Sequence, residues 1–157
     1  MIEVGRPVPE PRLTDTTGAE VRLSDHRGGG VLVYFMRHTG CPMCNLHVKH
    51  LAAHAADYAA HGVAVLVAVP DEPDTASRWA AAKKLPFPVV IGAGSTPHAG
   101  VGLARTVFGS MQRSGTVLVD HAGVVRYLRI ATMPTGGYSH RAVMRAIEDL
   151  HRARTDR

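Results

Sequence analysis

Two short, strongly apolar segments flank a helix-like segment in the first half of the chain, and this arrangement constrains the fold most. Residues 31–35 (Val-Leu-Val-Tyr-Phe) and 63–69 are rich in β-branched side chains without polar alternation, which is typical of strands covered on both faces of a sheet. Between them, residues 42–61 contain no glycine and carry apolar side chains at helical spacing, which predicts an amphipathic helix. A strand, a helix and a second strand in this order predict a parallel pair joined by a right-handed crossover.

The remaining segments extend this unit into an α/β fold. The expected elements are an edge hairpin around the turn at 14–18, a helix at 74–84, a strand at 88–91, a short helix at 101–107, a hairpin of strands 116–119 and 124–130, and a last helix at 139–152 with Ser139 as N-cap. The chain has 157 residues, 45% of them hydrophobic, and neither a repeat nor a low-complexity linker divides it. We therefore expect a single α/β domain over residues 1–157, with a mixed central sheet flanked by helices.

Charge and hydropathy exclude several classes of function. The net charge is +5, and seven arginines between residues 126 and 157 supply most of the excess. No Lys/Arg run with interleaved aromatics accompanies them, so the sequence does not favour nucleic-acid binding. The longest apolar runs are far shorter than the roughly 20 residues of a membrane span, and the first residues do not have the pattern of a secretory signal. A cytoplasmic protein without membrane association is the expectation.

The two cysteines stand three residues apart, in the motif Cys-Pro-Met-Cys at 41–44, where the first strand leads into the helix. This spacing at a strand-to-helix junction indicates redox chemistry. In the first helical turn, Cys41 meets unpaired backbone N–H groups and the positive end of the helix dipole, which stabilise a thiolate, and Arg37 or a protonated His38 could add to this field. Pro42 has no N–H to lose in the first turn. Cys44 lies on the apolar stripe of the helix, so we expect it to be buried and Cys41 to face the rim.

Several segments resemble the peroxiredoxin (alkyl hydroperoxide reductase/thiol-specific antioxidant) family. They are residues 4–9 (Val-Gly-Arg-Pro-Val-Pro), 23–25 (Leu-Ser-Asp), 86–90 (Pro-Phe-Pro-Val-Val), 115–120 (Gly-Thr-Val-Leu-Val-Asp) and 123–126 (Gly-Val-Val-Arg), together with the apolar strand and the cysteine motif. Residues 35–44, Phe-Met-Arg-His-Thr-Gly-Cys-Pro-Met-Cys, are most similar to a peroxiredoxin-like subgroup with a Cys-Pro-x-Cys motif. The resemblance implies a thioredoxin-like fold and a thiol peroxidase in which Cys41 attacks and Cys44 resolves the product as an internal disulfide.

The resemblance also suggests the composition of the site. The expected catalytic residues are Cys41, Cys44, Arg37 and Thr39, and the substrate-pocket candidates are His38, Pro42, Arg113 and Gly115. The expected substrate is a hydroperoxide or a disulfide, and the expected electron donor is a thioredoxin-like protein or a low-molecular-weight thiol. A homodimer is a possible assembly, and we expect neither a cofactor nor a metal ion.

Two alternatives remain open at this point. Typical peroxiredoxins have proline and threonine where this chain has Tyr34 and His38, and this difference favours a thiol-disulfide oxidoreductase without significant peroxidase activity. The second alternative is a metal-binding protein of thioredoxin-like fold, because Cys41 and Cys44 with an outside ligand could hold Zn or Cu(I).

The histidines that follow the cysteines do not complete a metal site. On a helix, His50 points about 180° away from Cys41, so Cys41, Cys44, His47 and His50 cannot all reach one ion. We interpret His47, His50 and His54 as a half-exposed polar flank of the helix.

Overall fold

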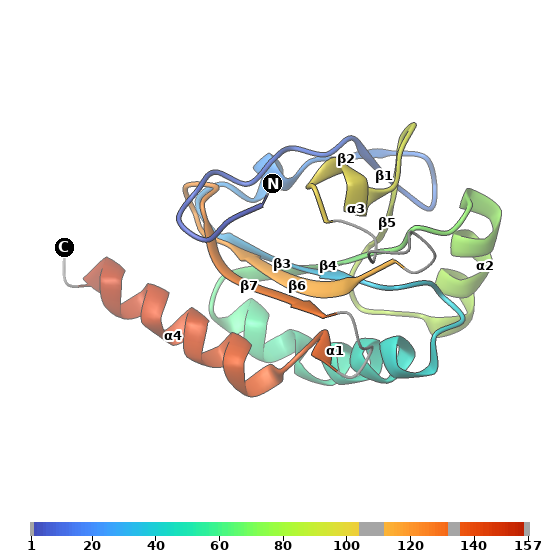
Figure 1. Cartoon of the computed structure of the whole chain (residues 1–157). Coiled ribbons are helices and arrows are strands. Elements are labelled where there is room, and N and C mark those ends of the chain that lie inside the picture. Colours follow the sequence, from blue (N-terminus) through green and yellow to red (C-terminus); the bar gives the residue numbers. More distant parts are fainter. Residues whose placement is uncertain (1, 104–111, 132–135, 156–157) are drawn as a thin grey trace.

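The computed structural model describes residues 2–103, 112–131 and 136–155. Within these ranges, seven strands form one mixed sheet in the order β2-β1-β5-β4-β3-β6-β7 (Figure 1). The strands are β1 (Leu13–Asp15), β2 (Glu20–Val21), β3 (Gly30–Phe35), β4 (Val63–Ala68), β5 (Val89–Gly92), β6 (Ser114–Val119) and β7 (Val125–Ala131). The helices are α1 (Pro42–Ala60), α2 (Pro73–Lys83), α3 (Pro97–Gly100), α4 (His140–Thr155) and a short 3-10 helix, η1 (Leu23–His26).

The predicted strand-helix-strand unit forms the centre of the sheet. Strand β3 pairs in parallel with β4, from Gly30 opposite Val63 to Phe35 opposite Ala68. All six residues of β3 are buried, which confirms that this apolar segment is a strand covered on both faces. Strand β6 pairs antiparallel with the other edge of β3, and β7 continues the sheet as the predicted hairpin partner of β6.

The sheet separates two layers of buried side chains. Helices α1, α2 and α4 cover one face, whereas the N-terminal segment and α3 cover the other (Figure 1). Successive residues of β3 alternate between these layers, so that Leu32 and Tyr34 point toward α1 while Val33 and Phe35 point away from it. This alternation places Tyr34 on the same side of the sheet as both cysteines.

The structure corrects one predicted element. A short helix was expected at 101–107, but the helical turn α3 comes earlier, because Pro97 suits the first helical position and the Thr96 hydroxyl accepts the N–H of Ala99. Residues 101 and 102 form a turn and residue 103 has no regular structure, whereas residues 104–107 lie outside the described part of the chain. The predicted N-cap of α4 is confirmed, since Ser139 Oγ accepts the N–H of Ala142 at 3.3 Å.

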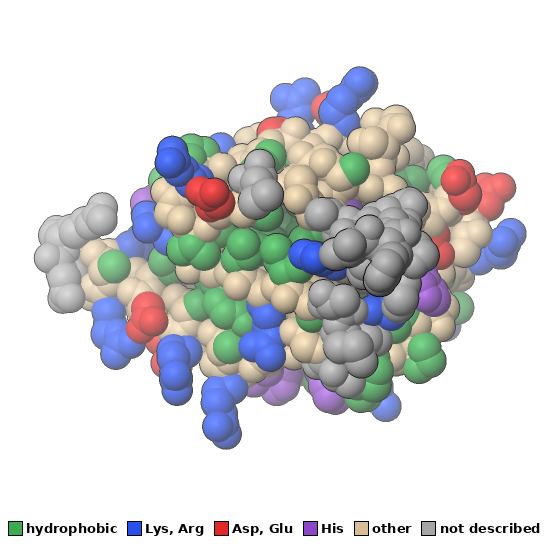
Figure 2. Space-filling view, in the orientation of Figure 1, with side chains coloured by type: hydrophobic (Ala, Val, Ile, Leu, Met, Phe, Trp, Pro, Cys, Tyr) green, Lys and Arg blue, Asp and Glu red, His purple; other side chains and the backbone are tan. Residues whose placement is uncertain are grey.

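The face of the molecule seen in Figure 2 agrees with the charge pattern of the sequence. Basic side chains are spaced along α4, where acidic and apolar side chains separate them (Figure 2). Among the described residues, no helix combines the length and the apolar character that crossing a bilayer requires.

Candidate active site

The sulfur of Cys41 caps the start of α1. Cys41 is the N-cap residue, with an extended backbone, and its Sγ accepts the backbone N–H of Cys44 at 3.4 Å. Pro42 occupies the first helical position, where no intrahelical N–H bond is required. The side chain of a cap residue points back over the first turn, and Cys41 is therefore only 4% exposed. The expectation that Cys41 faces the rim is wrong, because the sulfur is covered where it caps the helix.

Cys44 lies one turn further along α1 and is fully buried, as predicted. Its Sγ accepts the backbone N–H of Arg37 at 3.4 Å. Burial raises the pKa of the Cys44 thiol, and the Arg37 N–H partly opposes this effect. Both cysteines are reduced in the structure, so α1 presents a capping thiol with a second, more deeply buried thiol behind it.

The loop that leads to Cys41 is held by residues from three other segments. The Thr39 hydroxyl donates to Asp71 Oδ2 at 2.7 Å, and the Thr39 N–H donates to Asp71 Oδ1 at 3.0 Å. Asn45 Nδ2 donates to the carbonyl oxygens of Thr39 and Cys41, both at 2.8 Å, and Trp79 Nε1 donates to Asn45 Oδ1 at 2.9 Å. The hydroxyl proton of Thr39 is thus directed at Asp71.

Sequence reasoning missed Asp71 and Asn45. A signal for Asp71 was present, because only Pro70 separates it from the second predicted parallel strand, and parallel strands bring their carboxyl ends to one edge of a sheet. Asn45 had no such signal, since its role depends on the path of the loop before the helix.

The remaining pocket candidates lie around this edge of the sheet in different environments. His38, Gly40 and Pro42 are exposed and border Cys41 in sequence, whereas Arg37 and Arg113 are half-buried. His38 Nδ1 accepts the N–H of Gly40 at 3.1 Å, so its ring is part of the loop structure.

Gly115 is positioned by strand packing. It lies opposite Phe35 in the pairing of β6 with β3, so the start of β6 reaches the end of β3 that leads to Cys41. Directly paired residues point to the same face, and Gly115 therefore faces the layer on the side away from α1. A Cβ atom at this position would lie 2.5 Å from the carbonyl oxygen of Arg129, so the close approach of β7 requires a glycine here.

Tyr34 and His47 form a buried polar pair beside the cysteines. Tyr34 Oη and His47 Nδ1 are 2.8 Å apart, and the two rings meet edge to face with centroids 5.7 Å apart. His47 is only 6% exposed, and burial lowers its pKa. The interpretation of His47 as part of a half-exposed flank is therefore wrong, because its position three residues after Cys44 places it on the buried stripe, where Tyr34 satisfies its ring nitrogen.

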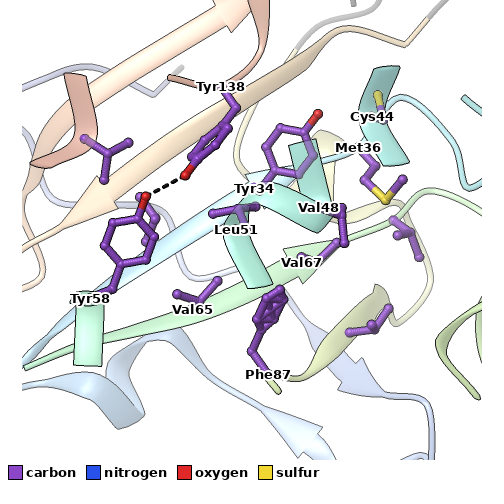
Figure 3. Packing of buried hydrophobic residues seen from close by; sticks show 14 of the residues in the cluster. Tyr34, Met36, Cys44, Val48, Leu51, Tyr58, Val65, Val67, Phe87 and Tyr138 are labelled. Atoms are coloured by element: carbon purple, nitrogen blue, oxygen red, sulfur yellow. Dashed lines mark hydrogen bonds between the residues drawn. The ribbon is translucent and has the colours of Figure 1, made fainter. Parts of the chain in front are cut away.

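A second polar cluster joins α1 to the start of α4. The Tyr58 hydroxyl is 2.6 Å from the Tyr138 hydroxyl (Figure 3). It is also 2.7 Å from His140 Nδ1. One potential ligand atom from each of His54, Asp57 and His140 lies within 4.8 Å of the others. The two imidazole rings, however, stack with centroids 3.5 Å apart and planes 10° from parallel, so their in-plane lone pairs do not converge on one point. We assign no metal to this cluster.

A comparison with known families identifies the chain. The sequence profile of the AhpC/TSA family matches residues 4–128, which include both cysteines and the loop that leads to them. The chain belongs to the AhpC/TSA family. A protein of Mycobacterium tuberculosis whose name describes it as a candidate peroxiredoxin is 30% identical over 122 residues, 78% of this chain and 73% of that protein. The thiol-disulfide oxidoreductase ResA of Geobacillus kaustophilus is 35% identical over 91 residues, 57% of this chain and 52% of ResA.

The fold of this AhpC/TSA member agrees with the assignment. The crystal structure of peroxidoxin BcpB from Mycobacterium tuberculosis superposes with a TM-score of 0.78, covering 96% of this chain and 97% of that chain at 20% sequence identity. The expected thioredoxin-like α/β fold is therefore confirmed. Within the AhpC/TSA family, a pair of thiols at the start of a helix makes this chain a thiol oxidoreductase of peroxiredoxin type.

Proposed function

We propose that the protein reduces hydroperoxides with Cys41 as the attacking thiolate and Cys44 as the resolving thiol. The observation that carries this proposal is the position of Cys41 Sγ, which caps α1 and accepts the N–H of Cys44. Negative charge on that sulfur is stabilised by this N–H and by the positive end of the helix. Cys44 lies behind it on the same helix at a spacing of i and i+3, which suits formation of a disulfide.

The reaction has two steps. The Cys41 thiolate attacks the terminal peroxide oxygen, the O–O bond breaks, and the leaving alkoxide or hydroxide takes up a proton, which leaves Cys41 as a sulfenic acid. The Cys44 sulfur then attacks the Cys41 sulfur, the S–O bond breaks, and water leaves as the disulfide forms. A thioredoxin-like protein or a low-molecular-weight thiol supplies the two electrons that restore both thiols.

The surroundings of Cys41 support the approach of a small peroxide. His38, Gly40 and Pro42 form an exposed flank beside the covered sulfur. The positive charge of Arg37 lies near the two sulfurs. Burial and both cysteines raise the pKa of Tyr34, and Arg37 lowers it, so all three side chains act on the same hydroxyl. We propose that Arg37 and the loop held by Thr39 orient the peroxide, with Arg113 and Gly115 at the adjacent strand end.

Two single substitutions test the roles of the cysteines. Cys41→Ser should abolish the first step, whereas Cys44→Ser should leave it intact and trap Cys41 as a sulfenic acid, because the chain has two cysteines in total. Mass spectrometry after addition of hydrogen peroxide and dimedone, a reagent for sulfenic acids, distinguishes the variants. Equal loss of reactivity in both variants, or a dimedone adduct on Cys44 alone, would contradict this assignment.

A second candidate is a thiol-disulfide oxidoreductase with negligible peroxidase activity. The likeness to ResA and the presence of Tyr34 and His38 at family positions of proline and threonine favour it. Stopped-flow mixing of the reduced protein with hydrogen peroxide, an organic hydroperoxide or a small disulfide separates the two. Trp79, bonded to Asn45 beside the cysteine loop, should report each reaction by its fluorescence. We expect a hydroperoxide to react faster than the disulfide, and the opposite order would favour the second candidate.

Three further expectations stay predictions. A single domain over residues 1–157 predicts one cooperative unfolding transition. A homodimer predicts twice the 16.8 kDa chain mass in sedimentation. A cytoplasmic location predicts recovery of the protein in the cytosolic fraction of its cell.

A further inference from the structure

The buried position of Cys44 creates a requirement that the two-step scheme does not meet by itself. Cys44 must lose its proton to attack the Cys41 sulfur, yet its side chain is fully buried and burial raises the pKa of its thiol. A group that takes this proton must lie beside Cys44 and be connected to solvent.

Tyr34 lies where such a group is needed. Its side chain is fully buried and points from β3 toward α1, between Tyr138 and the turn of α1 that carries Cys44 (Figure 3). Its hydroxyl lies on the side of the ring that is turned toward Cys44 (Figure 3). The electrostatic effects agree with this placement, because burial and Cys44 raise the pKa of Tyr34, and Tyr34 acts to lower the pKa of Cys44.

His47 connects Tyr34 to the surface. Its Nδ1 is 2.8 Å from Tyr34 Oη, and 6% of the residue is exposed. The groups that face His47 are the hydroxyl of Tyr34, the ring of Tyr138, the imidazole of His50 on α1 and the guanidinium of Arg129 on β7. Burial lowers the pKa of His47, and His50 and Arg129 act in the same direction, which favours the neutral form of its ring. When the neutral His47 ring carries its proton on Nε2, Nδ1 accepts a hydrogen bond from the Tyr34 hydroxyl. The oxygen of Tyr34 then still has a lone pair that can accept the proton of the Cys44 thiol.

We propose that Tyr34 and His47 form a proton relay for Cys44, with Tyr34 as a catalytic residue and His47 as a positioning and proton-accepting residue. The inference rests on the proposed formation of a disulfide between Cys41 and Cys44. As the Cys44 sulfur attacks, its proton moves to Tyr34 Oη while the Tyr34 proton moves to His47 Nδ1. His47 then releases a proton to solvent, and the hydroxide that leaves Cys41 takes one up, so the step yields the disulfide and water with no net change in protons.

The attack of Cys44 can be observed without peroxide. In a stopped-flow experiment, excess 5,5′-dithiobis(2-nitrobenzoate) reacts with reduced protein, and attack by Cys41 releases one coloured thiolate in a phase that depends on reagent concentration. Attack by Cys44 on the mixed disulfide releases a second coloured thiolate in a phase that does not depend on that concentration. Cys44→Ser, which lacks the second phase, assigns it.

Matched substitutions separate the relay from packing. Tyr34→Phe keeps the ring and removes the hydroxyl, and it should slow the second phase about 100-fold without a comparable effect on the first. Tyr138→Phe is the matched control, because the Tyr138 ring lies beside Tyr34 but its hydroxyl bonds to Tyr58 and not to His47. This substitution should leave the second phase unchanged. His47→Gln should act like Tyr34→Phe, whereas His50→Gln, on the exposed side of the same helix, should retain the wild-type rate at pH 7.5.

The pH profile gives a signature that loosened packing would not produce. The wild-type second phase should be independent of pH near neutrality and should fall in acid as His47 becomes protonated. In Tyr34→Phe the rate should instead rise tenfold per pH unit with the thiolate fraction of Cys44. A wild-type rate and profile in Tyr34→Phe, or equal slowing by Tyr138→Phe, would overturn the relay. Because the reagent replaces peroxide, the result does not depend on whether the protein is a peroxidase.

Discussion

Single residues of the site have roles that their chemistry alone did not indicate. The motif at 41–44 and its redox character follow from spacing, because i and i+3 on a helix bring two thiols together. The burial of Cys41 depends on the path of the loop before it. The hydrogen-bond partner of Thr39 is Asp71, which lies 32 positions away along the chain. Residues that meet only through tertiary structure leave no local pattern, and this is why the cysteines were predicted and their supports were not.

The Thr39 side chain should act mainly on the position of the cysteine loop. Thr39→Val removes the hydroxyl bond to Asp71 and should lower the free energy of unfolding by about 1–2 kcal/mol, because a carboxylate oxygen loses its partner. It should also slow attack by Cys41 on a small disulfide. Thr39→Ser retains the hydroxyl and should restore both values in urea unfolding and stopped-flow assays. Equal behaviour of the two variants would contradict this role.

His98 should make the stability of the protein sensitive to acid. Its side chain is fully buried, and its Nε2 donates to the Met36 carbonyl at 2.6 Å. Burial lowers the pKa of His98 to about 4, although the Met36 bond and Asp71 oppose the shift. The unfolded chain therefore binds a proton at higher pH than the folded one. The contribution of His98 is complete above pH 6.5 and is lost as the pH falls toward 4, by at most about 3 kcal/mol.

His98→Gln tests this contribution, since glutamine can still donate to the Met36 carbonyl but does not titrate. Urea unfolding between pH 4 and 7 should show a smaller loss of stability in acid for the variant than for the wild type. Parallel curves for the two proteins would show that His98 does not titrate as described.

At the scale of elements, the sequence predicted best where local periodicity and tertiary packing agree. The unit β3-α1-β4 and the hairpin β6-β7 have strong apolar patterns, and their predicted bounds differ from the observed ones by few residues. The predicted helix at 101–107 does not begin at Val101, because Thr96 and Pro97 start a helical turn earlier, and its residues 104–107 lie outside the described chain. The half-exposed flank was wrong for His47, because contact with the Tyr34 hydroxyl holds its ring in the core. Such contacts outweigh weak propensities.

Gly115 tests whether β6 and β7 depend on close backbone approach. Gly115→Ala places a Cβ atom 2.5 Å from the Arg129 carbonyl oxygen, and β7 must shift to make room. We expect the free energy of unfolding to fall by about 1–3 kcal/mol, measured by chemical denaturation. Gly40→Ala, whose Cβ atom would meet His38 Nδ1 at 3.2 Å beside Cys41, is the control and should cost less. A larger cost for Gly40→Ala would show that strand packing is not what requires a glycine at 115.

At the scale of the whole molecule, one face of the sheet combines the redox site with the attachment of α4. Helix α1 carries Cys44 near its start and Tyr58 near its end, and the side chains between them pack on β3 and β4. Tyr58 contacts Tyr138 through its hydroxyl (Figure 3) and also contacts His140, so a buried pair of hydroxyls links α1 to the segment that begins α4.

Removing the Tyr58 hydroxyl should weaken this link. In Tyr58→Phe, the Tyr138 hydroxyl and His140 Nδ1 both lose their partner, and the free energy of unfolding should fall by about 2–3 kcal/mol. Tyr138→Phe should cost less, because Tyr58 keeps its bond to His140. Equilibrium urea unfolding of both variants measures the difference, and the reverse order of stability would contradict this account of the α1–α4 junction.

The central claim is that Cys41 and Cys44 together consume one hydroperoxide and end as an internal disulfide. The most direct measurement mixes fully reduced wild-type protein with one equivalent of hydrogen peroxide and follows free thiols and intact mass. The account predicts loss of both thiols per peroxide, a mass lower by two hydrogens, and a proteolytic peptide pair linked through Cys41 and Cys44. Unchanged thiols, or oxygen added to Cys41 without that linkage, would contradict it.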